Sequence, residues 1–108
     1  MKTMRNPNRR PTHPGAILRE DVLPALKMTQ GEFAKRLGVS RLTVSELLHE
    51  KRGLSAEMAV RIATLLQTTP EGWLRMQEAV DLWDVHQQPG KFASVKPLPK
   101  ERLQSEAA

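Results

Sequence analysis

The chain has 108 residues, of which 39% are hydrophobic and 27% are charged, and this composition is ordinary for one small globular domain with short tails. It contains no cysteine, which excludes disulfide bonds and thiolate-bound metals. The formal net charge of +5 favours a polyanionic partner such as nucleic acid or an anionic membrane surface, although a basic surface can also serve solubility alone. Because the sequence has no signal-peptide pattern and no long apolar run, we expect a cytoplasmic protein without a membrane segment.

The two ends of the chain are predicted to lie outside the folded domain, which we place at residues 13–84. Residues 1–12 form a basic arm without acidic residues, and we expect this arm to be flexible because it has little to bury. Residues 85–108 carry prolines and scattered charges, and they lack clear helical or strand periodicity until a weak polar stretch near Glu101. We expect a mobile C-terminal tail.

The first two predicted helices have recognisable boundaries. His13, or the threonine before it, can cap a helix that has Pro14 at its first position, and Pro24 is expected to end or kink that helix. A second helix begins after Thr29, whose hydroxyl is expected to accept from the Glu32 amide while the Glu32 carboxylate reaches back in a capping box.

The third helix follows after a tight turn. Gly38 stands where a left-handed C-cap residue is favoured, and Ser40 can cap the helix that follows. The predicted buried face of this third helix consists of Val44, Leu47 and Leu48. Two short amphipathic helices joined in this way, over residues 29–48, indicate a helix-turn-helix.

Two further helices complete the predicted domain. A fourth begins after Ser55, and a fifth has Thr69 as its cap, Pro70 at its first position and an acid next to it. No segment shows sustained alternation rich in β-branched residues, so we predict an all-α fold of five helices.

The polar face of the third helix is the candidate for reading DNA. A helix that enters the major groove needs one packed face and polar or small residues on the other. Arginine can bind guanine bidentately, glutamate can accept from cytosine N4, and leucine can cover a thymine methyl group. The candidate base-reading residues are Arg41, Leu42, Ser45 and Glu46, with His49 on the same side. The alternative is that these residues form the solvated face of a surface helix.

Residues flanking this face are candidates for phosphate contacts, which fix register without reading sequence. They are an amide at the start of the second helix, two short hydroxyls and two basic residues after the third helix: Gln30, Ser40, Thr43, Lys51 and Arg52. Each has an ordinary alternative as a cap, a surface residue or part of a basic loop.

The sequence offers little for catalysis or for metal binding. The three histidines are scattered, and Glu46 with His49 places two potential ligands on one helix face without a second pair elsewhere. There is no glycine-rich phosphate loop, and serine and histidine residues occur without a third partner in a suggestive arrangement. We expect no enzyme, no cofactor, no metal and no small-molecule substrate.

Several fragments together resemble the lambda-repressor-like, XRE-type helix-turn-helix domain in the form carried by HigA-type antitoxins. They are His13-Pro14-Gly15, Ile17-Leu18-Arg19-Glu20, Met28-Thr29-Gln30, Gly38-Val39-Ser40-Arg41, residues 51–59, Trp73-Leu74 and Asp81-Leu82-Trp83. The resemblance covers roughly residues 13–84.

The resemblance implies a dimer that represses its own operon and also holds a HigB-like mRNA endonuclease toxin inactive. It maps base reading onto Arg41, Leu42 and Glu46, and a phosphate contact onto Gln30; a leucine at position 42 departs from the polar residue that often stands there.

Alternative functions remain open at this point. One is a stand-alone XRE-type repressor without a toxin, and another is an interaction adaptor that binds no DNA. Candidate dimer contacts on the fifth helix are Trp73, Val80 and Trp83. We favour the core for Trp73 and the interface for Trp83.

Overall fold

The computed structural model describes residues 8–107, and within them all regular structure is helical. The elements in chain order are α1 (Pro14–Ile17), the π-helical turn η1 (Leu18–Val22), α2 (Leu23–Leu26), α3 (Gln30–Leu37), α4 (Arg41–Leu48), α5 (Ala56–Leu66), α6 (Pro70–His86), the 3₁₀ turn η2 (Pro89–Phe92) and α7 (Lys100–Ala107). The five predicted helices are confirmed, with α1, η1 and α2 forming the first. No helix in the described part of the chain is long and apolar enough to cross a membrane.

Pro24 distorts the first helix but does not end it, because the helix continues to Leu26. Proline has no N–H group, and its ring collides with the carbonyl four residues earlier in a regular α-helix. The chain widens just before this point into η1, where the N–H of Leu23 donates to the carbonyl of Leu18, five residues back. The predicted kink therefore takes the form of a π-helical turn.

The predicted N-caps are present. The side chain of Thr29 accepts from the amide of Glu32 at 3.1 Å, and that of Ser40 accepts from the amide of Thr43 at 3.0 Å. The second half of the predicted capping box differs, since the carboxylate of Glu32 accepts from Arg36 Nε at 2.9 Å.

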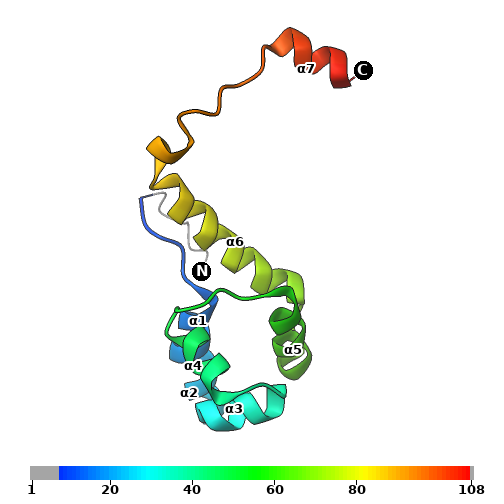
Figure 1. The fold of residues 1–108 in the computed structure, drawn as a ribbon. Helices are drawn as coiled ribbons and strands as arrows, with labels where there is room; N and C mark the ends of the chain where they lie inside the picture. The colour runs from blue at the N-terminus through cyan, green and yellow to red at the C-terminus, as the bar shows by residue number, and fades with distance from the viewer. Residues whose placement is uncertain (1–7, 108) are drawn as a thin grey trace.

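The core joins the first helix to α3, α4 and α5, with Trp73 of α6 closing it. Its largest fully buried side chains include Phe33, Leu18, Leu47, Leu48 and Ile62. Figure 1 shows α3 and α4 side by side at one end of the molecule, with α6 running away from them.

Close packing between α1 and α4 depends on Gly15. A Cβ atom at Gly15 would lie 1.9 Å from the carbonyl oxygen of Leu47, so only glycine fits there. A second contact links α6 to the loop after α4 through the buried side chain of Gln77. Its Oε1 accepts from the amide of Leu54 at 2.9 Å, and its Nε2 donates to Asp81 at 2.9 Å. These contacts fix the loop after α4 against α6.

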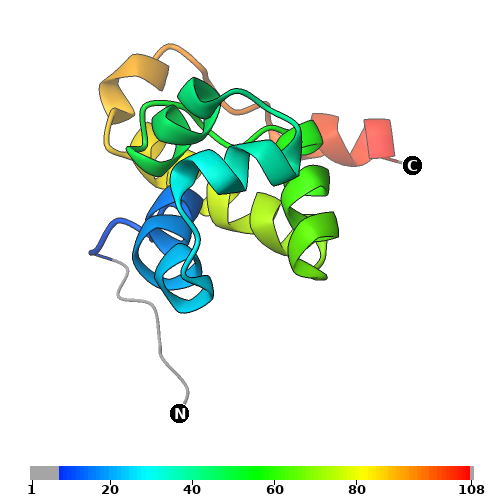
Figure 2. The same ribbon diagram turned by 90° about the horizontal axis from the view of Figure 1, so that it is seen from below.

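The chain ends differ in part from the expectation. The predicted basic arm lies largely outside the described residues, but Arg10 is held by ion pairs to Glu50 and Asp84. The predicted tail contains η2 and α7, and α7 coincides with the weak polar stretch near Glu101. Every residue from Val85 to Gln104 is exposed. Figure 1 shows this segment leaving the end of α6, with α7 away from the bundle; Figure 2 looks at the same chain from below, so that α7 is drawn behind the bundle.

Candidate nucleic-acid interface

The faces of α4 are arranged as predicted. Val44 is completely buried and Leu47 and Leu48 are 1% exposed, so this side of the helix is anchored in the core. Arg41 and Leu42 lie on the opposite side, where Leu42 is 67% exposed. A helix held by one apolar face and presenting a different face to solvent has the geometry needed to enter a DNA groove.

Ser45 and Glu46 also lie on the outer side of α4, although both are partly covered. Nδ1 of His49, at the C-cap, is 2.8 Å from the carbonyl oxygen of Ser45, so this nitrogen carries a proton in that contact. The second ring nitrogen, Nε2, takes no part in this contact. The four candidate base readers therefore lie on the outer side of α4, Arg41 and Leu42 exposed and the other two partly covered.

The hydroxyl groups of Ser40 and Thr43 lie together at the N-terminal end of α4, 2.8 Å apart. A single hydrogen bond between two hydroxyls uses one of their two protons. The second proton stays available to donate outward. This pair can therefore bind an anion beside the helix N-terminus while it continues to cap α4.

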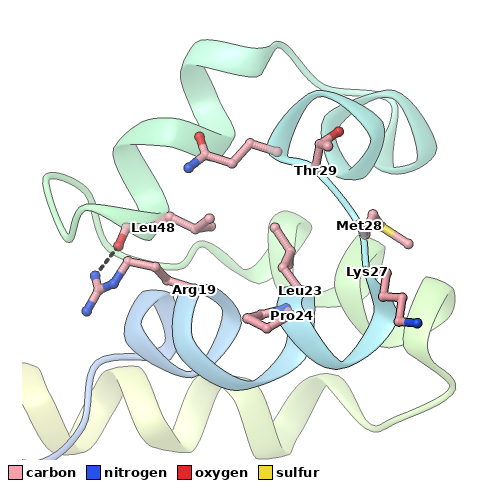
Figure 3. A pocket seen from close by; sticks show the side chains of 8 residues that line it. Arg19, Leu23, Pro24, Lys27, Met28, Thr29 and Leu48 are labelled. Carbon is pink, nitrogen blue, oxygen red and sulfur yellow. Dashed lines mark hydrogen bonds between the residues drawn. The ribbon is translucent and has the colours of Figure 1, made fainter.

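Gln30 lies at the edge of an open pocket of about 380 Å³, between the first helix and the helix-turn-helix. The other lining residues are Arg19, Leu23, Pro24, Lys27, Met28, Thr29 and Leu48. Figure 3 shows Arg19 on one side of the pocket, where it donates to the carbonyl of Leu48, and Lys27 on the other. Two cationic side chains thus stand near the predicted phosphate contact.

The backbone reverses direction at the end of α4. Glu50 adopts a left-handed conformation with φ of 61°. The amide of Lys51 donates to the carbonyl of Glu46 at 2.8 Å, and the amide of Glu50 donates to that of Leu47 at 3.1 Å. This pair of bonds is a Schellman motif, and it returns the chain beside α4. Arg52 consequently forms an ion pair with Glu46, its Nη2 lying 2.7 Å from Oε1.

Three chain segments meet around Glu50. Its carboxylate pairs with Arg10 at 3.2 Å and with Arg19 at 3.5 Å, and Arg10 also pairs with Asp84 of α6 at 2.9 Å. The hydrogen bond from Arg10 lowers the pKa of the Asp84 carboxyl, and the same contact raises the pKa of the Arg10 guanidinium. The end of α4 is therefore connected by charge to both the N-terminal segment and α6.

Two of the three candidate dimer residues are enclosed within the single chain. Trp73 is 7% exposed and its Nε1 donates to Thr68 at 2.8 Å, while Val80 is 1% exposed. Trp83 is partly exposed, and two other apolar residues near the C-terminal end of α6, Leu82 and Val85, are 52% and 42% exposed. Trp73 belongs to the core of the single chain and Val80 is buried in it, so among the three candidates only Trp83 is accessible in the single chain; the dimer contact itself stays a prediction.

No group of three or more potential metal-ligating side chains occurs within residues 8–107. The sequence did not predict the ion pairs among Arg10, Arg19 and Glu50, nor the hydrogen bond that Gln77 accepts from the backbone. The sequence did not predict the close contact at Gly15, and no local residue type marked Glu50 as a left-handed residue.

The family model described as "Helix-turn-helix" matches residues 18–74. The chain is 42% identical over 98 residues to antitoxin HigA-1 of Vibrio cholerae, covering 88% of this chain and 90% of the relative. It is 44% identical over 82 residues to the HTH-type transcriptional regulator YbaQ of Escherichia coli strain K12, with coverage of 76% and 73% respectively.

A solved structure of the antitoxin GraA in complex with its operator is similar over the whole bundle. The TM-score is 0.76 at 41% sequence identity, and the match covers 90% of this chain and 99% of that chain.

Proposed function

The chain belongs to the XRE-type helix-turn-helix family that includes the HigA antitoxins, and we propose that it is an antitoxin that also represses its own operon. The observation that best supports this proposal is the placement of α4. The helix is anchored through Val44, Leu47 and Leu48, and it presents its other face to solvent. The operator complex of the similar antitoxin GraA supports the assignment of that face to DNA.

The proposed readout assigns roles to the residues around α4. Arg41, Leu42, Ser45 and Glu46 contact base edges in the major groove. Phosphate contacts come from Gln30, Ser40, Thr43, Lys51 and Arg52. The protein acts in the cytoplasm as a binding protein without catalytic activity.

A dimer fits this function because two recognition helices about 34 Å apart match one turn of DNA. We place the contact between copies on the C-terminal part of α6, where Trp83 is partly exposed and where Leu82 and Val85 are exposed. The toxin partner, a HigB-like mRNA endonuclease, follows from the family.

The nearest alternative is a repressor without a toxin, and the similarity to the regulator YbaQ favours it. A footprint on DNA upstream of the chain's own reading frame, with and without the neighbouring gene product, separates the two. We expect protection of two half-sites, and co-purification of the neighbouring product with loss of its RNA cleavage. Protection without any partner binding would favour the stand-alone repressor, and absence of protection would overturn autorepression.

A further inference from the structure

The guanidinium of Arg52 forms an ion pair with the carboxylate of Glu46. Its Nε and Nη2 donate to the same carboxylate oxygen, Oε1, at 3.1 and 2.7 Å. Within the described part of the chain, the second oxygen, Oε2, accepts no hydrogen bond. One oxygen is thus fixed by the guanidinium and the other remains available to accept from a base.

The backbone around Arg52 is held on both sides. Before it, the amide of Lys51 donates to the carbonyl of Glu46 at 2.8 Å. After it, the amide of Leu54 donates to the buried side chain of Gln77 at 2.9 Å. The guanidinium therefore extends from a fixed point toward α4.

The pairing also changes the charge that α4 brings to DNA. A lone carboxylate that enters a groove is repelled by the phosphates on both sides. A guanidinium within hydrogen-bonding distance cancels this charge locally, while the carboxylate keeps free lone pairs for a base donor. Glu46 can then read a base amino group at a smaller electrostatic cost.

We propose that Arg52 is a positioning residue for sequence readout: it fixes and neutralises Glu46, and so sets the preference for a base pair with an amino donor, such as cytosine N4. The inference rests on the proposed DNA-binding function. Under this inference, Arg52 acts on base readout through Glu46 instead of contacting a phosphate itself.

The test uses the full-length chain and a random duplex library from which the wild type enriches its site. Affinities of wild type, Arg52→Ala, Glu46→Ala and the double variant are then measured on that site and on its single-base-pair variants, at several salt concentrations. Lys51→Ala is the matched control, because it removes a neighbouring cation that pairs with no carboxylate within residues 8–107.

We expect Arg52→Ala and Glu46→Ala to reduce discrimination at the same base pair, by about five- to 150-fold. The double variant should lose no more discrimination than Glu46→Ala alone. Lys51→Ala should weaken all sites alike and reduce the salt slope by about 1. Arg52→Lys keeps the charge but not the paired donors, so it should not restore discrimination. Melting temperatures should stay near wild type, because exposed ion pairs contribute little to folding.

If Arg52→Ala behaves like Lys51→Ala, or if Arg52→Lys restores full discrimination, the positioning role is overturned while DNA binding stands. A wild type that enriches no sequence would overturn the proposed function, and this inference with it.

Discussion

His13 shows how a single side chain can fix the start of the domain. It is 4% exposed, and its Nδ1 accepts from the amide of Gly15 at 2.9 Å. This cap requires Nδ1 to be unprotonated, because a ring nitrogen that carries a proton cannot accept a hydrogen bond. Burial is the main cause that lowers the pKa of His13, and the positive charge of Arg10 adds to it.

This burial predicts a loss of stability in acid. A group whose pKa is lowered on folding contributes stability that is present above its unfolded pKa, about 6.5 for histidine, and is lost as pH falls through the folded value. The unfolding free energy of the wild type should therefore decrease as pH falls below about 6.5. His13→Asn keeps a capping oxygen without a titratable ring and should flatten this dependence, as measured by urea unfolding from pH 7 to 5. Equal pH slopes for the two proteins would contradict the assignment.

At the residue scale, the sequence predicted which side of α4 is buried, because Val44, Leu47 and Leu48 follow the helical repeat. It did not predict the pair between Glu46 and Arg52. That contact depends on a chain reversal at Glu50, where no local residue type marks a left-handed conformation.

At the scale of single elements, the residues at the helix ends determine where each helix stops. α2, α3, α4 and α5 are each followed by a left-handed residue, respectively Lys27, Gly38, Glu50 and Gln67. The sequence indicated only Gly38, because glycine is the residue that adopts this conformation without strain. The N-caps were easier to predict, since Ser and Thr cap through their own side chains.

Gln67 offers a test of this strain. It is exposed and has φ of 57°, a conformation that costs non-glycine residues about 1 kcal/mol. Gln67→Gly should raise the unfolding free energy by about 0.5–1 kcal/mol, net of the greater freedom of glycine in the unfolded chain. Gln67→Ala is the control and should change stability little. Denaturant unfolding would refute the argument if the glycine variant were less stable than the alanine variant.

The first helix shows a limit of element prediction. Pro24 reliably marks a disturbance, but the surrounding packing decides its form. Leu18, at the start of η1, and Leu23, directly after it, are 0% and 5% exposed, so burial holds both turns in one helix. The π-helical turn keeps both side chains in the core and accommodates the proline.

At the scale of the whole molecule, the all-α class, the helix-turn-helix and the family followed from the sequence. The way in which the segments connect did not. Arg10, Glu50 and Asp84 are widely separated in the chain, and their ion pairs form only once α4 and α6 are in place. The same holds for Gln77, whose buried amide joins α6 to the loop after α4.

The central claim is that the exposed face of α4 reads the operator. The most direct test compares the affinities of wild type and Arg41→Ala for the enriched site and for unrelated duplex of equal length. Arg75→Ala, which removes an exposed arginine from α6, is the control for charge. We predict that Arg41→Ala loses about tenfold or more at the operator and much less on unrelated DNA. Unchanged operator affinity in Arg41→Ala, or an equal loss in Arg75→Ala, would contradict the account.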